Sequence, residues 1–264
     1  MQVVLVGAGR LATQLALALR ASGHEVLAVY SRTLSSAAAL TRQAGGTATD
    51  DVSQLPPHAD LFVIAVSDAA ITSLLPRLVA GRRSETFVHT AGSVPLSVFD
   101  SFDLSSYGVF YPMQTFSKER QVDFRRIPIF IEASDEPTLA RLHQLAASLS
   151  SEVRQLSSSE RRYLHLAAVF ASNFANHCYA LSSQVLQRCG LPLSIMLPLI
   201  DETAAKVHDL PPAQAQTGPA VRYDTPVIEA QSRLLEADPL LREVYDLMSH
   251  SIHELALAHQ SSTQ

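Results

Sequence analysis

Apolar residues before position 156 come in short runs separated by helical patterns. Nearly unbroken apolar runs at 2–7 and 61–66 are typical of strands that are buried on both faces. Amphipathic segments predict helices at 11–22, 35–44, 71–79 and 138–149. Further strands are expected at 24–30, 47–49, 86–90, 107–111, 127–132 and 152–156. Strands that alternate with helices predict an α/β, doubly wound parallel sheet.

The pattern changes after residue 156, and from there only helical periodicity is found. Ser157 and Glu160 have capping-box spacing, which predicts the start of a helix. This long helix runs to about Arg188 and is apolar nearly all round, which predicts burial between other elements. Further helices are expected at 194–208, 225–237 and 240–258. The chain should therefore form two domains, 1–156 with the sheet and 157–264 all helical.

Gly7, Gly9 and Ala12 follow the first strand with the spacing G-x-G-x-x-A. In this motif the first glycine permits a tight turn, the second lets a pyrophosphate approach the backbone, and the small third residue allows close helix–strand packing. The amides after Gly9 open a helix, whose N-terminus favours phosphate. The context predicts a Rossmann dinucleotide-binding domain; the alternative is a glycine-rich turn without a nucleotide.

The end of the second strand indicates which dinucleotide is bound. NAD sites usually carry Asp or Glu there, whereas this chain has Ser31, Arg32 and Thr33. A guanidinium pairs with phosphate in a fork, so the segment favours NADP (NADPH), unless Arg32 is an ordinary exposed arginine. The expected cofactor-binding residues are Gly7, Ala8, Gly9, Arg10, Leu11, Ala12, Ser31, Arg32, Thr33, Val66, Ser67 and Thr90.

Four polar side chains interrupt the long apolar helix: His165, Ser172, Asn173 and Asn176. At about 100° per residue they fall within roughly one quadrant of the helix. They either line a polar pocket or bond to nearby backbone or a subunit partner, since an unpaired buried amide costs about 1–3 kcal/mol. His165 is the best general acid available for the charge that hydride delivery leaves behind. The predicted catalytic residues are His165, Asn173 and Ser93.

Two loops follow strands of the predicted sheet, at the edge where open sheets bind ligands. In 89–95, Thr90 and Ser93 could face this crevice, as could Gln114 in 111–117; ordinary turn chemistry is the alternative. In the later loop 216–224, Arg222 either receives an anionic substrate group or pairs with Asp224 on the surface. The expected substrate residues are Gln114, Asn176, Thr217 and Arg222.

Composition narrows the possible partners. The net charge is −5 without a basic run, which argues against nucleic acid, and no stretch reaches the roughly 18 apolar residues of a membrane span. Cys178 and Cys189 show no disulfide or CxxC spacing, which favours the cytoplasm. His250, His253 and His259 lack a carboxylate or cysteine context, so we expect an exposed helix face and no metal site.

The chain resembles a bacterial family in six motifs: GAGRLA, HTAGS, GVFYPMQTFS, HLAAVFASNFANH, LPLIDET and TGPAVRYD. Its members join a Rossmann-like domain to a helical C-terminal domain of unknown function and are often labelled deazaflavin-dependent NADP oxidoreductases. They belong to a superfamily with pyrroline-5-carboxylate reductases, ketopantoate reductases and 6-phosphogluconate dehydrogenase-like enzymes. The resemblance implies an active site between sheet and helical domain, and a homodimer through the helices. Dehydrogenases of that superfamily commonly carry Lys and Asn on the first long helix, where this chain has His165 and Asn173 but no Lys.

These features together predict an NADP(H)-dependent oxidoreductase. Its substrate would be a small carbonyl, imine or hydroxy acid, bound at the cleft between the two domains. The alternative is an NADP(H)-binding sensor or regulatory protein without turnover. Either way the expected partners are a small molecule and a second copy of the chain, with neither nucleic acid nor membrane.

Overall fold

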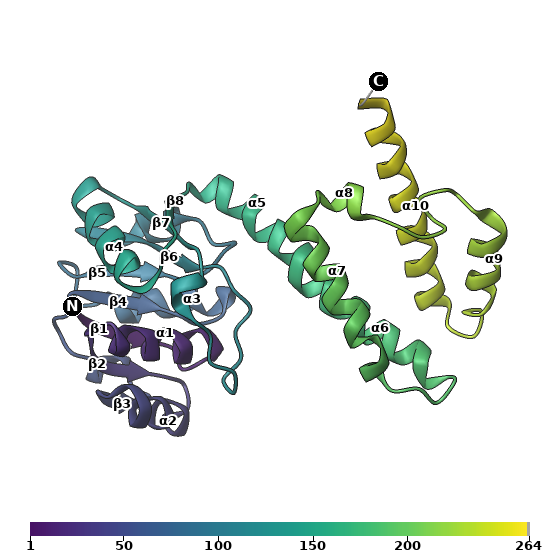
Figure 1. Cartoon of the computed structure of the whole chain (residues 1–264). Coiled ribbons are helices and arrows are strands. Elements are labelled where there is room, and N and C mark those ends of the chain that lie inside the picture. Colours follow the sequence, from purple (N-terminus) through teal and green to yellow (C-terminus); the bar gives the residue numbers. More distant parts are fainter. Residues whose placement is uncertain (263–264) are drawn as a thin grey trace. The chain divides into compact units, whose positions relative to one another are not determined.

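The computed structural model describes residues 1–262 and contains two compact units, the first being Met1–Asn173 and the second beginning at Phe174. The first unit is built on one eight-stranded sheet in the order β3-β2-β1-β4-β5-β6-β7-β8 (Figure 1). The strands are β1 (Gln2–Val6), β2 (Glu25–Tyr30), β3 (Thr47–Thr49), β4 (Leu61–Ile64), β5 (Thr86–His89), β6 (Ser106–Pro112), β7 (Ile129–Ala133) and β8 (Val153–Gln155). The predicted strands are confirmed, with ends that differ by one or two residues.

Four helices of the first unit lie between strands along the chain, and a fifth follows the last strand. They are α1 (Arg10–Ala21), α2 (Leu34–Ala44), α3 (Asp68–Leu78), α4 (Glu136–Leu149) and α5 (Ser158–Ala168), the last continuing into a π-helical segment, Val169–Phe174. Short 3-10 turns lie at Val52–Gln54, Leu96–Phe102 and Phe124–Arg126. The helices fall where the sequence predicts them, except that α3 begins earlier, at Asp68.

One strand pair departs from the predicted parallel sheet. β7 runs antiparallel to β6, whereas every other neighbouring pair is parallel. The cause is the connection between Pro112 and Ile129, which contains one 3-10 turn and no crossover helix. A strand returns parallel to its neighbour only through a crossover, so this link reverses its direction.

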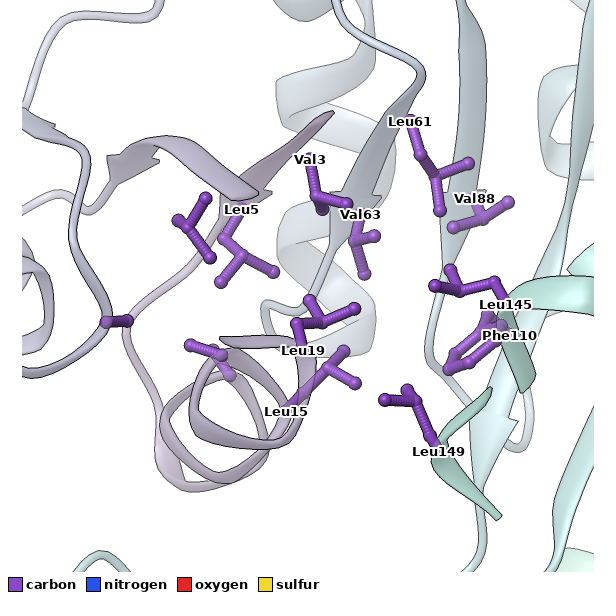
Figure 2. Packing of buried hydrophobic residues seen from close by; sticks show 14 of the residues in the cluster. Val3, Leu5, Leu15, Leu19, Leu61, Val63, Val88, Phe110, Leu145 and Leu149 are labelled. Carbon is purple, nitrogen blue, oxygen red and sulfur yellow. The ribbon is translucent and has the colours of Figure 1, made fainter. Parts of the chain in front are cut away.

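The core occupies both faces of the sheet. Val3 and Leu5 of β1 belong to one hydrophobic cluster, and Val4 and Val6 belong to the other. Successive side chains of a strand point to opposite faces, so a strand covered on both faces must be apolar throughout. Figure 2 shows the first cluster, in which side chains of β1, α1 and α4 pack together with Phe110 of β6.

The second unit contains helices and no strand along the part that the structure describes. Its helices are α6 (Ala175–Gln187), α7 (Leu197–Asp209), α8 (Pro212–Ala215), α9 (Thr225–Arg233) and α10 (Pro239–Ser262), with a 3-10 turn at Leu193–Met196. The predicted capping box at Ser157 is present, and Gly190 has a φ of 71° after the end of the long helix. The helix from α5 to α6 is continuous, so the units meet inside it, between Asn173 and Phe174, and not at the predicted position after residue 156.

The long helix is less buried than its apolar sequence predicts. Tyr163, Leu166 and Phe170 are 78%, 52% and 63% exposed. The sequence predicted burial between other elements, and within the first unit these three side chains are not buried in this way. Leu34 is the only large apolar side chain exposed before Tyr163 among the described residues, whereas many are exposed after it.

Three further expectations concern membranes, metals and histidines. Between residues 1 and 262, no helix combines the length and apolar character that crossing a bilayer requires. The same residues contain no cluster of three His, Cys, Asp or Glu side chains that could hold a metal ion. His253 does not lie on an open helix face as predicted, because its ring stacks on Tyr223 with centroids 4.3 Å apart.

A titratable side chain lies inside the core at the end of β5. His89 is fully buried, its Nδ1 accepts a hydrogen bond from the Ala91 amide at 3.2 Å, and its ring stacks on Phe99. Burial, followed by the charge of Arg161, lowers the pKa of His89 from 6.5 to about 4. The unfolded chain therefore takes up a proton between these pH values that the folded chain does not bind.

We predict that His89 contributes to acid destabilisation. As pH falls from 6.5 to 4, this residue should cost about 3 kcal/mol of folding free energy, at about 1.4 kcal/mol per pKa unit. His89→Phe keeps an aromatic ring but cannot titrate, so it should lose less stability over this interval than the wild type. Urea unfolding followed by circular dichroism at pH 7 and pH 4 measures the loss of unfolding free energy in the wild type and in His89→Phe. Equal losses for the two proteins would contradict the prediction.

Candidate functional site

The predicted ligand-binding loops follow neighbouring strands of the sheet. β2, β1, β4, β5 and β6 lie side by side and run in the same direction, so the segments after them share one edge. Adjacent strands are about 4.8 Å apart, so this edge forms an extended row of loops. A ligand crevice at the carboxyl edge of an open α/β sheet is expected on general grounds.

Gly7 must be glycine for a reason internal to the protein. Its φ is 131°, a conformation that side chains disfavour, and an added Cβ would lie 2.2 Å from the carbonyl oxygen of Ala65. The turn after β1 thus passes in contact with the segment after β4. Ala12 is fully buried within the core cluster, as expected of a small residue where helix packs on strand.

Gly9 has no such internal reason. Its φ is −77°, which any residue adopts, and an added Cβ would meet no protein atom within 4 Å. Helix α1 begins at the next residue without a side-chain cap and without an acidic residue in its first turn. The first amides of α1 therefore face open space, where a phosphate group would satisfy them.

This space belongs to a groove of about 510 Å³ along the loops after β1, β2 and β4. Ten of the twelve predicted cofactor residues line it: Gly7, Ala8, Gly9, Arg10, Leu11, Ser31, Arg32, Thr33, Val66 and Ser67. Sequence reasoning missed the other lining residues, Tyr30, Ser36, Ala65, Ala70, Ser73 and Leu74. Four of them lie on α2 or α3, where the spacing of the residues along the helix gave no sign of a groove: Ser36, Ala70, Ser73 and Leu74.

The β2 end of the groove carries the groups expected to bind a 2′-phosphate. Arg32 is exposed, and it takes part in no ion pair with the described residues. Ser31 and Ser36 line the groove beside it, and α2 begins at Leu34 without an acid in its first turn. The charge and the hydroxyl groups here are therefore available to an anionic ligand.

A second pocket of about 520 Å³ lies where β6 ends and the long helix passes. Three predicted residues line it, His165, Asn173 and Gln114, together with Ser172 of the predicted polar stripe. The other lining residues are Tyr111, Met113, Thr115, Leu164, Ala167, Ala168, Val169 and Ala171. The π-helical segment Val169–Phe174 forms part of the wall, and such segments are often found at functional sites.

Tyr111 and His165 form a polar pair in this otherwise mostly apolar pocket. The Tyr111 hydroxyl and His165 Nδ1 are 3.1 Å apart, and the two rings meet edge to face at 70°. Tyr111 is only 8% exposed. Burial raises the pKa of Tyr111, the charge of Arg161 opposes this rise, and Asp68 adds to it. The pair offers one proton-donating group linked to a second group that can replace the proton.

The His165 ring also contacts the loop after β5. An added Cβ on Gly92 would lie 2.5 Å from His165 Nδ1, so glycine lets the loop approach the ring. The neighbouring Ser93 bonds to the Asp68 carboxylate, and Asp68 follows Ser67, which lines the first groove. A chain of contacts therefore joins the first groove to the second pocket.

Arg161 fixes the helix that carries His165. It is 1% exposed, its guanidinium forms an ion pair with Glu132 of β7, and it donates to the Val94 carbonyl at 2.6 Å. Glu132 also accepts from the Ser158 amide and hydroxyl, and the Ser158 hydroxyl accepts from the Leu96 amide at 2.8 Å. These bonds connect β7, α5 and the loop after β5.

The structure does not bring every predicted residue to these pockets. The Thr90 hydroxyl donates to the Ile64 carbonyl at 3.3 Å, and Ser93 bonds to Asp68, so the two side chains are engaged beside the pockets and do not line them. Asn176 is exposed beyond the π-helical segment, in the second unit. Thr217 and Arg222 are exposed in that unit as well, and no ion pair joins Arg222 to Asp224.

Sequence reasoning missed Tyr111 and Arg161. A tyrosine at the carboxyl end of a buried strand was the available signal for Tyr111. Arg161 precedes His165 by one helical turn, a spacing that places both on one helix face. An arginine near a helix start is usually solvated, however, so its burial could not be foreseen.

Two family models match the chain. One, described as an NADP oxidoreductase that depends on coenzyme F420, matches residues 2–91, and the other, a domain of unknown function named DUF2520, matches residues 127–252. No curated protein matches the chain.

Solved structures of similar proteins share the whole fold. A Bacteroides fragilis protein described as a candidate NADP oxidoreductase is 50% identical, over 96% of this chain and 98% of its own, with a TM-score of 0.92. An imine reductase of Myxococcus stipitatus in complex with NADP⁺ is 17% identical, over 98% of this chain and 95% of its own, with a TM-score of 0.71. A reductive aminase of Aspergillus terreus in complex with NADPH and ethyl-5-oxohexanoate is 16% identical, over 98% and 91%, with a TM-score of 0.63.

The last two likenesses show a common fold, while the first is close enough to show the family. The family that the sequence motifs resemble, the Rossmann fold and the NADP cofactor inferred from Ser31–Thr33 all agree with this relationship. The chain therefore belongs to the family of the Bacteroides fragilis protein, in which an NADP oxidoreductase domain is joined to a helical C-terminal domain.

Proposed function

We propose that this protein uses NADPH to reduce a small carbonyl or imine compound, or runs the reverse reaction on the product, such as a hydroxy acid. The observation that carries the proposal is the Tyr111–His165 pair, 3.1 Å apart in a pocket at the same sheet edge as the nucleotide groove. A reductase needs both a cofactor site and a proton donor at that edge; the groove would supply the first and the Tyr111–His165 pair the second.

The residues of the first groove fit an NADP molecule. The open amides at the start of α1 and the vacant space beside Gly9 suit the pyrophosphate. Arg32, Ser31, Thr33 and Ser36 suit the 2′-phosphate of the adenosine ribose. Because β2, β1, β4, β5 and β6 follow one another, a dinucleotide that starts at β2 extends along the edge toward the second pocket.

NADPH bound in the groove would supply the hydride for the carbon of the C=O or C=N bond. The oxygen or nitrogen of that bond gains negative charge, and the Tyr111 hydroxyl donates a proton to it. His165, in contact with the same hydroxyl, returns a proton to Tyr111. Asn173, Gln114 and Ser172 provide hydrogen-bonding groups in the pocket wall, and the alanine and leucine side chains exclude water.

The structural neighbours agree with this class of substrate. The names of two of them, imine reductase and reductive aminase, describe reduction of C=N bonds. The alternative function, binding of NADP(H) without turnover, shares the groove but gives no role to the Tyr111–His165 pair. Deuteride transfer from labelled NADPH to any compound of a carbonyl and imine panel would exclude it.

We further propose that a second copy of the chain covers the exposed apolar face of the long helix. Tyr163 and Leu166 are large, apolar and more than half exposed. Contiguous apolar surface of this kind marks interfaces, and self-association is its commonest form in soluble enzymes. Sedimentation velocity should show twice the 28.6 kDa mass of one chain, and a monomer at micromolar concentration would refute the dimer.

Substitution of the two glycines of the turn should have different effects, on NADPH binding for Gly9 and on stability for Gly7. Gly9→Ala should leave the melting temperature unchanged, because no protein atom lies near the added methyl group, while NADPH binding weakens about 10-fold or more as the phosphate is displaced. Gly7→Ala should lower the melting temperature, because its methyl group clashes with the Ala65 carbonyl. Circular dichroism and NADPH fluorescence measure the two properties. Unchanged NADPH affinity in Gly9→Ala would argue against the groove as the cofactor site.

Arg32 should discriminate between NADPH and NADH. Arg32→Ala removes a charge-assisted hydrogen bond, worth about 1.5–3 kcal/mol, so the NADPH dissociation constant should rise about 10- to 100-fold. NADH lacks the 2′-phosphate and should bind the two proteins alike. Arg42→Ala, at the far end of α2, is the matched control and should bind NADPH as the wild type does. Equal loss of both nucleotides in Arg32→Ala would contradict a 2′-phosphate contact.

The proton-donating pair should affect turnover without affecting cofactor binding. Tyr111→Phe removes the donor hydroxyl and should slow deuteride transfer about 100-fold, with an unchanged NADPH dissociation constant. His165→Ala should slow it as well, since Tyr111 loses its proton supply. Tyr107→Phe, on the same strand with its hydroxyl on Asp100, is the control and should retain activity. Full activity in Tyr111→Phe would remove the pair from the mechanism.

A further inference from the structure

The most deeply buried charge of the first unit lies next to the proposed proton-donating pair. Arg161 is the largest of the fully buried side chains and sits one helical turn before His165. Its carboxylate partner, Glu132, is partly accessible, with a side chain that is 16% exposed. A buried ion pair of this kind rarely adds stability compared with apolar residues of the same volume, which raises the question of its role.

The contacts of Arg161 control the position of His165. The guanidinium holds the start of α5 to Glu132 on β7 and to the Val94 carbonyl, and Ser158 holds the Leu96 amide. The loop fixed in this way places Gly92 directly against the His165 ring. The Tyr111 hydroxyl, from β6, lies 3.1 Å from the Nδ1 atom of the same ring. The imidazole thus contacts the loop that the Arg161 network fixes and the strand β6, which pairs with β7.

We propose that Arg161, held by Glu132, is a positioning residue that seats His165 against Tyr111 and supplies the buried positive charge that acts on the Tyr111 hydroxyl. The proposal rests on the proposed function, since it assigns Arg161 a role in the proton transfer made by Tyr111. The charged and titratable groups around Tyr111 are His165 and Arg161 on α5 and Asp68 on α3, with Glu132 on β7 behind Arg161.

The role of the ion pair can be tested through the direction in which each substitution moves the pKa of Tyr111. The positive charge of Arg161 favours the ionised form of Tyr111 and opposes the rise in pKa that burial causes. Removing Arg161 should therefore make the hydroxyl less acidic. Removing the charge of Glu132 leaves Arg161 uncompensated and should make the hydroxyl more acidic. A role in packing alone would give both changes the same direction, because both break the same buried contact.

The experiment places 3-fluorotyrosine at position 111 of the full-length protein and follows its ¹⁹F NMR signal as a function of pH. We expect Arg161→Met to move the Tyr111 titration to higher pH and Glu132→Gln to move it to lower pH. Arg82→Met is the matched control, because Arg82 is also a buried arginine, but it is bound to the Leu55 and Pro56 carbonyls and does not act on Tyr111. This variant should leave the titration unchanged.

A second variant covers the case in which Arg161→Met does not fold. Replacing both partners, Arg161→Met with Glu132→Leu, avoids an unpaired buried charge. This double variant should titrate at higher pH than Glu132→Gln. Shifts of the same sign in Arg161→Met and Glu132→Gln, or no shift in either, would overturn the proposal.

Kinetics provides the second readout. In Arg161→Met we expect the rate of deuteride transfer to fall about 10-fold or more, with an unchanged NADPH dissociation constant. Arg161→Lys keeps the positive charge but loses the forked guanidinium, so it should retain more of this rate than Arg161→Met. An equal loss in the lysine and methionine variants would overturn the role of the charge. Absence of deuteride transfer in the wild type would instead refute the proposed reductase, while the NMR titration would still report on Arg161.

Discussion

The ion pair between Arg161 and Glu132 is the interaction on which the arrangement of the second pocket depends. It joins the antiparallel strand β7 to the start of α5 and, through Val94, to the loop after β5. Together with the bonds of Ser158 to Glu132 and to the Leu96 amide, it holds the His165 ring against both Gly92 and Tyr111. Breaking a buried pair by removing one partner typically costs about 3–5 kcal/mol, so the geometry of the pocket is coupled to folding of the unit.

The antiparallel strand β7 has a function in this arrangement. A further parallel strand would need a crossover helix, whereas β7 returns beside β6 and brings Glu132 close to the start of α5. The five parallel strands β2, β1, β4, β5 and β6 end at the edge that carries the groove and the second pocket, and β7 anchors the helix that lines this pocket. The departure from a parallel sheet and the position of the pocket thus have one structural origin.

The two glycines of the phosphate turn illustrate two kinds of constraint in one motif. Gly7 is required by the protein, because any Cβ would meet the Ala65 carbonyl. Gly9 is not required by any protein atom, and the proposed nucleotide gives a reason for it. The contrast makes Gly9 the more informative residue about function, although the sequence motif presents both in the same way.

The sequence by itself determined the order of strands and helices, the turn after β1 and the preference for NADP at Ser31–Thr33. Each of these depends on local periodicity or on groups within a few residues of one another, which a sequence displays directly. The same reasoning identified His165 and Asn173, because polar residues stand out on an apolar helix. It also named Asn176, which follows the π-helical segment Val169–Phe174 and belongs to the second unit.

Only the tertiary structure revealed the partners of these residues. Tyr111 and His165 are 54 positions apart, and Arg161 reaches Val94 across 67 positions, so no local pattern links them. The burial of Arg161, the reversed direction of β7 and the use of Thr90 for the Ile64 carbonyl likewise depend on contacts between distant segments. A sequence states which chemical groups a chain contains, whereas packing decides which of them meet and which of them lose contact with water.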